Sequence, residues 1–231
     1  MIKKLRHLWA LTNSKRLVYY LKSQGVSIRG DVFFRSPLTT RIDLTRPTLV
    51  SFGDNVDINK NFQLLTHDYG SFVFRNKFCD FLNSSGAVSI GSNIYFGTNV
   101  TVLKGVSIGD NCIIAACSVV NKSIPANSVA AGVPCKVICS IEEYYNKRKQ
   151  KSLGEAVEYV NSIFERLNRA PYIHELYEEF VWFVDGSNYD KYSGLLPLDK
   201  QLGIAKYHYI QTHKAPFDGY EDFINYCKKQ E

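Results

Sequence analysis

The stretch "QLLTHDYGSF", residues 63–72, places an imidazole, a carboxylate and a phenol in succession at His67, Asp68 and Tyr69. Imidazole titrates close to neutral pH, so His67 could remove a proton from a hydroxyl or an amine as a general base. It could also ligate a metal ion or cap a turn. Asp68 could orient the imidazole, bind a polar group of a substrate, or be a plain surface carboxylate. Adjacent side chains are poorly placed for direct pairing, which favours the substrate over the imidazole as its partner.

A repeat of six residues surrounds these side chains. Every sixth residue is apolar or small in two runs, which are Val26, Val32, Leu38, Leu44, Val50, Val56 and Phe62, and then Val88, Ile94, Val100, Val106, Cys112, Ser118 and Ile124. A period of six does not match the 3.6-residue period of an α-helix. The sequence therefore predicts short strands stacked coil upon coil, interrupted by an inserted loop at 63–87 that contains His67.

The residues that precede these apolar positions favour tight turns. They are Asn55, Asn61, Asn93, Asn99, Gly105 and Asn111, with Asp31 and Asp43 in the first run. Asn, Asp and Gly tolerate a positive φ angle better than other residues do. Each six-residue unit is therefore predicted to end in a corner.

A glycine slot completes the repeat in the strings "SFGDNV", "SIGSNI", "YFGTNV" and "SIGDNC". These strings resemble the hexapeptide repeat of the left-handed parallel β-helix, and residues 107–138, with "AAGVPC" at 130–135, resemble the closing segment of hexapeptide-repeat acetyltransferases. That family includes galactoside, maltose and capsular or exopolysaccharide O-acetyltransferases. The resemblance covers residues 26–138, about half of the chain. The left-handed sense of the coil rests on this resemblance alone, because ordinary parallel crossovers are right-handed.

The resemblance implies an enzyme that transfers acetyl from acetyl-coenzyme A directly to a hydroxyl of a sugar or glycan acceptor, at sites between the subunits of a homotrimer. It assigns His67 as the general base and Asp68, Tyr69 and Tyr95 to the acceptor. The residues that it assigns to coenzyme A are Gly97, Thr98, Ala115, Ala116, Asn121, Lys122 and Lys136. Several positions depart from the family pattern: Tyr95 replaces a common Trp, Asn121 a common Thr and Cys139 a basic residue, and Leu103 interrupts the glycine slot.

Three alternatives bear on this assignment. A carbonic anhydrase family shares the same prism and holds zinc with three histidines, whereas His67 is the only histidine between Val26 and Ile138. The sequence therefore predicts no metal site. N-acetylation of a nucleotide-linked amino sugar would use the same base. A β-helix that only binds partners is the non-enzymatic alternative, although the retained His67 and "AAGVPCK" segment favour an enzyme.

The two ends differ from the repeat. Residues 1–25 are predicted to form a basic helical domain, with one helix over 1–22 that either caps the prism or lies on an anionic membrane surface. Residues 139–231 are predicted to be an α-helical extension, with a first helix capped by Ser140 and Glu143. Further helices are predicted near 173–184 and 220–228. The fold class is thus mainly β, with helical ends.

Composition limits the remaining possibilities. The net charge of +6 equals the number of cations in residues 1–22, which are Lys3, Lys4, Arg6, Lys15, Arg16 and Lys22. The rest of the chain is neutral, which disfavours a nucleic-acid-binding protein. The six cysteines show no disulfide or metal-binding spacing and are predicted to be reduced thiols of a cytoplasmic protein. No apolar run is long enough to span a membrane.

Overall fold

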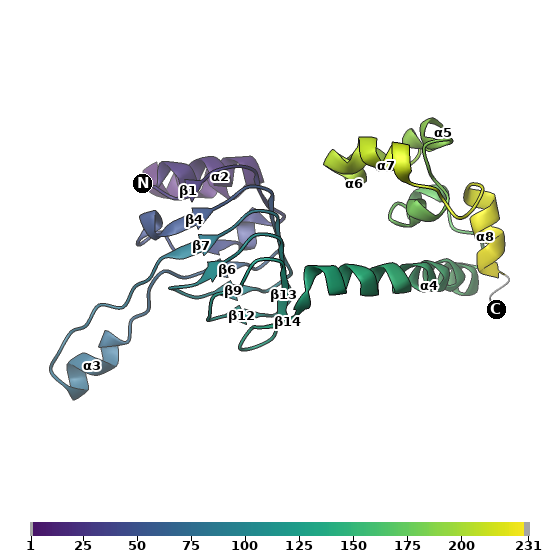
Figure 1. Ribbon diagram of the computed structural model, residues 1–231. Helices are drawn as coiled ribbons and strands as arrows, with labels where there is room; N and C mark the ends of the chain where they lie inside the picture. The colour runs from purple at the N-terminus through teal and green to yellow at the C-terminus, as the bar shows by residue number, and fades with distance from the viewer. Residues whose placement is uncertain (1, 229–231) are drawn as a thin grey trace. The chain divides into compact units, whose positions relative to one another are not determined.

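The computed structural model describes residues 2–228 of the chain. Contacts between residues divide it into two compact units, Met1–Tyr145 and Asn146–Glu231. The first unit is a parallel β-helix with two helices at its N-terminal end, and the second unit is helical (Figure 1). Helices account for 41% of the chain, so the mainly β class holds for the prism and not for the whole chain.

Three sheets form the sides of the prism. Sheet A contains β1 (Ser27–Ile28), β4 (Val50–Phe52), β7 (Val88–Ile90) and β10 (Ser107–Ile108). Sheet B contains β2 (Val32–Phe34), β5 (Val56–Ile58), β8 (Ile94–Phe96), β11 (Cys112–Ile114), β13 (Ser128–Ala131) and β14 (Lys136–Ser140). Sheet C contains β3 (Arg41–Ile42), β6 (Gln63–Leu64), β9 (Thr101–Val102) and β12 (Val119–Val120). From β1 to β12 the chain visits A, B and C in turn, and β13 and β14 then both join sheet B. Every strand pair is parallel except β13 with β14.

The regular coil has 18 residues, as the hydrogen bond from Asn93 to Asn111 shows. The first coil is longer, because Ser27 pairs with Ser51 at a spacing of 24 residues. Arg41 pairs with Gln63 at a spacing of 22, so four of the six extra residues follow β3 and two precede it. Short 3-10 turns at η1 (Pro37–Thr39) and η2 (Pro47–Leu49) lie in these two insertions.

The two insertions explain the main error in the predicted core. Because they sum to one repeat, the sixfold pattern runs through them without a visible break. Leu38 is 74% exposed, although its position in the pattern predicts burial, and Leu44 is half-buried. Thr40, two residues after Leu38, is buried instead. The remaining twelve of the fourteen predicted inward positions are buried.

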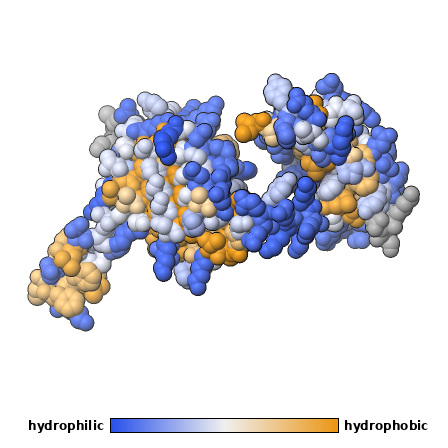
Figure 2. Space-filling model, viewed as in Figure 1, coloured by the Kyte–Doolittle hydropathy of each residue, from blue (hydrophilic) through white to orange (hydrophobic). Residues whose placement is uncertain are grey.

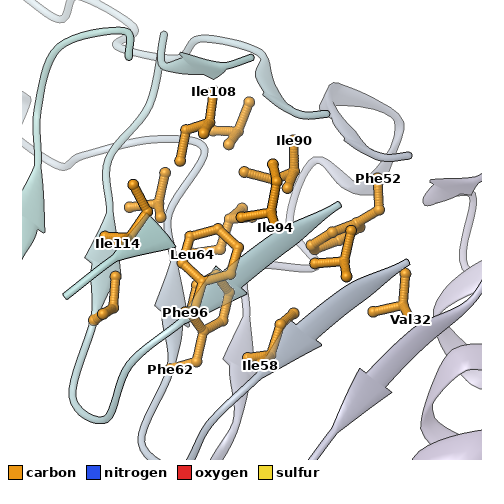
Figure 3. Close-up of a cluster of buried hydrophobic side chains, with 14 of the residues drawn as sticks. Val32, Phe52, Ile58, Phe62, Leu64, Ile90, Ile94, Phe96, Ile108 and Ile114 are labelled. Carbon is orange, nitrogen blue, oxygen red and sulfur yellow. The ribbon is translucent and has the colours of Figure 1, made fainter. Parts of the chain in front are cut away.

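The core is a column of aliphatic and aromatic side chains inside the coils (Figure 3). Each strand contributes alternate residues, because side chains two apart point to the same face of a strand. In β4, for example, Val50 and Phe52 are buried on either side of Ser51. Phe62 and Phe96 from successive coils meet edge to face, with ring centroids 4.9 Å apart. No coil could bury these side chains alone, so stacking stabilises the prism.

The corners adopt the predicted positive φ angles. Asn55, Asn61, Asn93, Asn99, Asn111 and Gly105 all have φ between 53° and 77°. Side-chain amides of successive corners also hydrogen-bond to one another, from Asn55 through Asn93 and Asn111 to Asn127. Asp31 and Asp43 do not have positive φ angles, so their prediction as corners of this kind is wrong.

Two helices precede the first coil where one was predicted. α1 (Ile2–Ala10) ends before Asn13, whose side chain accepts a hydrogen bond from Lys15 N and caps α2 (Ser14–Ser23). α2 buries Leu17 and Leu21 in the core of the prism. Ser14 Oγ also accepts a hydrogen bond from Phe34 N of β2. The second helix therefore caps the open end of the prism.

The long helix α4 (Ile141–Leu167) begins at the predicted capping box, in which Ser140 and Glu143 exchange hydrogen bonds. The predicted helix α8 (Tyr220–Lys228) is also present. Residues 173–184 form two 3-10 turns, η3 (Ile173–Glu175) and η4 (Glu179–Trp182), so the helix predicted there is wrong. Burial of Leu176, Phe180, Phe183 and Val184 outweighs helix propensity in this segment.

Short helices without a strong sequence pattern complete the second unit. They are α5 (Tyr189–Ser193), α6 (Leu198–Leu202), η5 (Gly203–Ala205) and α7 (Lys206–Thr212). Aromatic side chains fill its core, with Phe183 against Tyr192, Tyr220 and Phe223. Among the helices of residues 2–228, none has both the length and the hydrophobicity needed to cross a bilayer.

Stacking of Phe62 against Phe96 is tested by replacing Phe62 with Ala. We expect the free energy of unfolding, measured by chemical denaturation, to fall by roughly 3–5 kcal/mol, because a large buried ring is lost. Phe33→Ala is the matched control, since the Phe33 side chain is exposed on β2. Equal losses in the two variants would contradict the assigned inward and outward faces.

Candidate active site

His67 lies at the end of sheet C where an arm leaves the prism. The arm, residues 66–87, follows β6 and carries the helix α3 (Ser71–Lys77) away from the coils (Figure 1). Its two ends run antiparallel, with a bridge between His67 and Ser85 and a hydrogen bond from Gly86 N to Thr66 O of 2.9 Å. His67 is therefore held at the base of the arm, directly against the prism.

The imidazole of His67 pairs with Asp43, which directly follows β3 one coil earlier. Nδ1 of His67 lies 2.5 Å from Oδ2 of Asp43. The Asp43 side chain is only 6% exposed, whereas the His67 side chain is 33% exposed. The pair thus has a buried carboxylate behind an imidazole that reaches solvent.

Two threonines complete the environment of Asp43. Thr66 donates to Oδ2 from its amide, at 3.0 Å, and from its hydroxyl, at 2.6 Å. Thr45 donates to Oδ1 from its amide, at 2.9 Å, and from its hydroxyl, at 2.7 Å. Burial raises the pKa of Asp43, but the hydrogen bonds from Thr66, Thr45 and His67 outweigh it and hold the pKa well below its usual range. Asp43 is therefore ionised at neutral pH.

An ionised Asp43 determines which nitrogen of the neutral His67 imidazole carries the proton. A carboxylate only accepts hydrogen bonds, so Nδ1 of His67 must be the donor in this contact. In the neutral imidazole the proton then lies on Nδ1, and Nε2 keeps its lone pair. His67 is consequently oriented as a base whose free nitrogen faces away from the carboxylate.

Asp68 has a different partner. Its carboxylate pairs with Lys104 and accepts hydrogen bonds from Ser84 Oγ, at 2.8 Å, and from Gly70 N, at 2.9 Å. The hydrogen bond from Lys104 is the main cause of its lowered pKa. Asp68 therefore ties the arm to the end of β9 and does not orient the imidazole.

The arm carries an exposed apolar surface. Tyr69 lies beside Phe72, with ring centroids 6.4 Å apart. Phe72, Val73, Phe78, Phe81 and Leu82 are also exposed. Figure 2 shows these apolar side chains gathered over the arm.

The residues assigned to coenzyme A fall into two groups. Gly97 and Thr98 follow β8, and Ala115 and Ala116 follow β11, so these four share the edge where sheet B ends. Coils approach closely there: a Cβ atom at position 97 would lie 2.5 Å from Ala116 N. This narrow strip of small residues, in which Ala116 is exposed, suits an extended ligand lying along the prism.

Of the remaining residues assigned to coenzyme A, Lys136 lies at the end of sheet B near Ala115, and Asn121 and Lys122 lie at the end of sheet C. Asn121 and Lys122 follow β12, at the same edge of sheet C as His67. Lys136 begins β14 and pairs with Ala131. Tyr95 lies on β8, where its hydroxyl accepts a hydrogen bond from Asn59 Nδ2 of 3.2 Å.

Known proteins match the repeat region. A family description, "Bacterial transferase hexapeptide (six repeats)", matches residues 87–122. Galactoside O-acetyltransferase from Escherichia coli K12 is 37% identical over 134 residues, which cover 56% of this chain and 63% of that enzyme. The putative lipopolysaccharide biosynthesis O-acetyl transferase WbbJ of the same organism is 32% identical over 154 residues, covering 53% of this chain and 76% of the relative. The chain belongs to the hexapeptide-repeat acetyltransferase family.

A solved structure of a galactoside acetyltransferase in complex with coenzyme A is also similar to this hexapeptide-repeat acetyltransferase. It is 24% identical, with a TM-score of 0.42, and the match covers 60% of this chain and 78% of that chain. The sequence match spans less than two thirds of the galactoside enzyme from Escherichia coli.

Three residues of this candidate site were not assigned from the sequence. Asp43 was interpreted as a corner, and Thr45 and Thr66 were not singled out. The usable signal is positional: Asp43 directly follows β3, His67 lies three residues after β6, and Arg41 of β3 pairs with Gln63 of β6. Parallel strands of one sheet end at the same edge, so the residues that follow β3 and β6 are neighbours.

The charge of Asp43 should stabilise the acetyltransferase only where this carboxylate is ionised. Its folded pKa is depressed, so its contribution is fully present above the unfolded value of about 3.9 and is lost as pH falls further. We expect Asp43→Asn to be less stable at pH 7 by roughly 1–3 kcal/mol, because the donors around one of the two carboxylate oxygens lose their acceptor. The difference, measured by chemical denaturation, should shrink below about pH 4.

Asp31→Asn is the control, because the Asp31 side chain is exposed. Its effect should be small at every pH. A difference for Asp43→Asn that stays constant from neutral pH to pH 3 would show that shape, and not charge, holds the cluster together.

Proposed function

We propose that the protein transfers an acetyl group from acetyl-coenzyme A to a hydroxyl of a sugar in a polysaccharide or glycan precursor. His67 is the general base of this reaction. The observation that carries the proposal is the pairing of the His67 imidazole with a buried, ionised Asp43. The two relatives from Escherichia coli support the reaction class, because both are named as O-acetyltransferases. Since acetyl-coenzyme A is a metabolite of the cytoplasm, we place the reaction there.

The chemistry follows from the orientation of the imidazole. Nε2 of His67 takes the hydroxyl proton while the sugar oxygen attacks the thioester carbonyl. A C–O bond forms, the C–S bond breaks, and the proton passes from the imidazolium to the departing thiolate. Asp43 stabilises the positive imidazolium that exists between these two transfers, because its negative charge is held 2.5 Å from Nδ1.

The donor would reach His67 from a second copy of the chain. Within one chain, His67 lies at the edge where sheet C ends, whereas Gly97, Thr98, Ala115 and Ala116 lie where sheet B ends. Two edges of one prism face different directions. We propose a left-handed coil assembled as a homotrimer, in which one copy supplies the base and its neighbour the strip for the pantetheine arm. Asn121, Lys122 and Lys136 would bind the nucleotide end, where a lysine can pair with phosphate.

The acceptor would lie between the base and the arm. Tyr69, two residues after His67, has an exposed ring, and exposed aromatic rings can stack on sugars. Asp68 is anchored by Lys104 but remains half exposed, so it keeps lone pairs for a sugar hydroxyl. Tyr95 would contact the acceptor from the neighbouring copy.

Loss of the base should abolish most of the activity. We expect His67→Ala to lower kcat about 10²- to 10⁴-fold, because the hydroxyl loses its proton acceptor. Asp43→Asn should lower kcat less and leave KM for acetyl-coenzyme A nearly unchanged. The measurement is acetyl transfer to a panel of sugars with free hydroxyl or free amino groups.

His174→Ala is the matched control, because His174 is an exposed histidine of the second unit. Unchanged turnover in His67→Ala would overturn the proposal. Transfer only to amines would replace the O-acetyltransferase with an N-acetyltransferase.

The two-copy site can be tested by complementation. Ala116→Trp should block the donor strip, and His67→Ala removes the base, so each variant alone should be inactive. Co-expressed chains with different tags, purified through both tags, should regain part of the activity, since some sites combine an intact base with an intact strip.

Two differently tagged His67→Ala chains serve as the control and should stay inactive. Sites that lie within a single chain predict no recovery in the mixed oligomers either. That result would exclude the intersubunit arrangement while leaving the role of His67 untouched.

A further inference from the structure

The first helix turns its apolar side away from the protein. Leu5, Leu8 and Trp9 of α1 are 59%, 60% and 44% exposed. Leu8 and Trp9 lie three and four residues after Leu5, so the three side chains share one side of the helix. Ala10, on another side, is fully buried against the rest of the unit. An isolated soluble domain would normally pack the larger apolar side inward.

Capping of the prism does not explain this surface. α2 closes the first coil with Leu17 and Leu21, and α1 packs on α2 through small contacts such as Ala10 and the edge-to-face pair of His7 with Tyr20. Between the two helices lies a groove of about 420 Å³, lined by Leu5, Arg6, Trp9, Tyr19, Tyr20 and Ser23. The exposed side of α1 therefore continues into a mainly apolar groove whose lining includes the cationic side chain of Arg6.

The charges around this surface have one sign. Residues 1–30 contain no Asp or Glu. Arg6, Lys15, Arg16 and Lys22 are exposed, and among the residues that the structure describes none of the ion pairs involves them. Arg16 lies over the ring of Trp9, with its guanidinium carbon 5.2 Å from the ring centroid. A complementary partner must be anionic and must also accept aliphatic and indole side chains.

We propose that the surface formed by Leu5, Leu8 and Trp9 of α1, with the adjoining groove against α2, binds the anionic face of a lipid bilayer. Leucine and tryptophan side chains insert at the boundary between headgroups and acyl chains, and the cations pair with lipid phosphates. The apolar arm at 66–87 lacks this charge pattern, because Asp68 and Asp80 accompany its cations Arg75 and Lys77. The protein would therefore be a peripheral membrane protein that attaches through its N-terminal helices.

Vesicle sedimentation of the full chain tests this proposal. We expect binding to vesicles of equal parts phosphatidylcholine and phosphatidylglycerol to be at least about tenfold tighter than to phosphatidylcholine alone. High salt should weaken the binding, because it screens exposed charges. Leu8→Ser combined with Trp9→Ser should abolish it, and Lys15→Gln with Lys22→Gln should remove most of the preference for the anionic lipid.

Phe72→Ser with Phe78→Ser is the matched control, because it removes two exposed aromatic residues from the arm and should leave vesicle binding unchanged. Circular dichroism verifies that every variant is folded. Equal binding to both kinds of vesicle, or unchanged binding after Leu8→Ser with Trp9→Ser, would overturn the proposal. An oligomer that this double variant disperses without lipid would instead make the surface an interface between copies of the chain.

Discussion

Each coil of the prism can bury its inward side chains only against the coils before and after it. Stacking therefore requires each side of each coil to point apolar side chains inward and then to turn a corner. Each six-residue unit supplies one such strand and one such corner. Asn suits the corners for two reasons. Its backbone adopts the positive φ angle of the turn, and its side-chain amide hydrogen-bonds to the Asn at the corner of the next coil. Once the coils are stacked in register, residues that are distant in sequence share an edge.

The register of the stacked coils brings His67 and Asp43 together. Both residues follow a strand of sheet C, and β3 and β6 are neighbours in that sheet. The carboxylate is buried between Thr45, which belongs to the enlarged first coil, and Thr66, which follows β6 in the next coil. The imidazole reaches solvent because the chain leaves the prism immediately after it. Burial on one side and exposure on the other together produce an oriented base.

The sequence predicts the parts of this molecule that repeat. The period of six identified the coils, and the Asn and Gly positions identified the corners, because both signals recur at each turn. The first coil was assigned less well: insertions of two and four residues sum to one repeat, so Leu38 retains the sixfold phase while Thr40 takes the inward place. Asp43 was missed for the same reason. The break between α1 and α2 depends on one cap at Asn13, which a search for helical periodicity overlooks.

The arm shows how this architecture tolerates added sequence. Asn55 and Asn93 are neighbours in the corner ladder although 38 residues separate them, whereas Asn93 and Asn111 are separated by 18. The extra chain leaves and returns at one corner, and the coils on either side stack as if it were absent. Sequence can therefore be added at such a corner without disturbing the coils that hold His67 against Asp43.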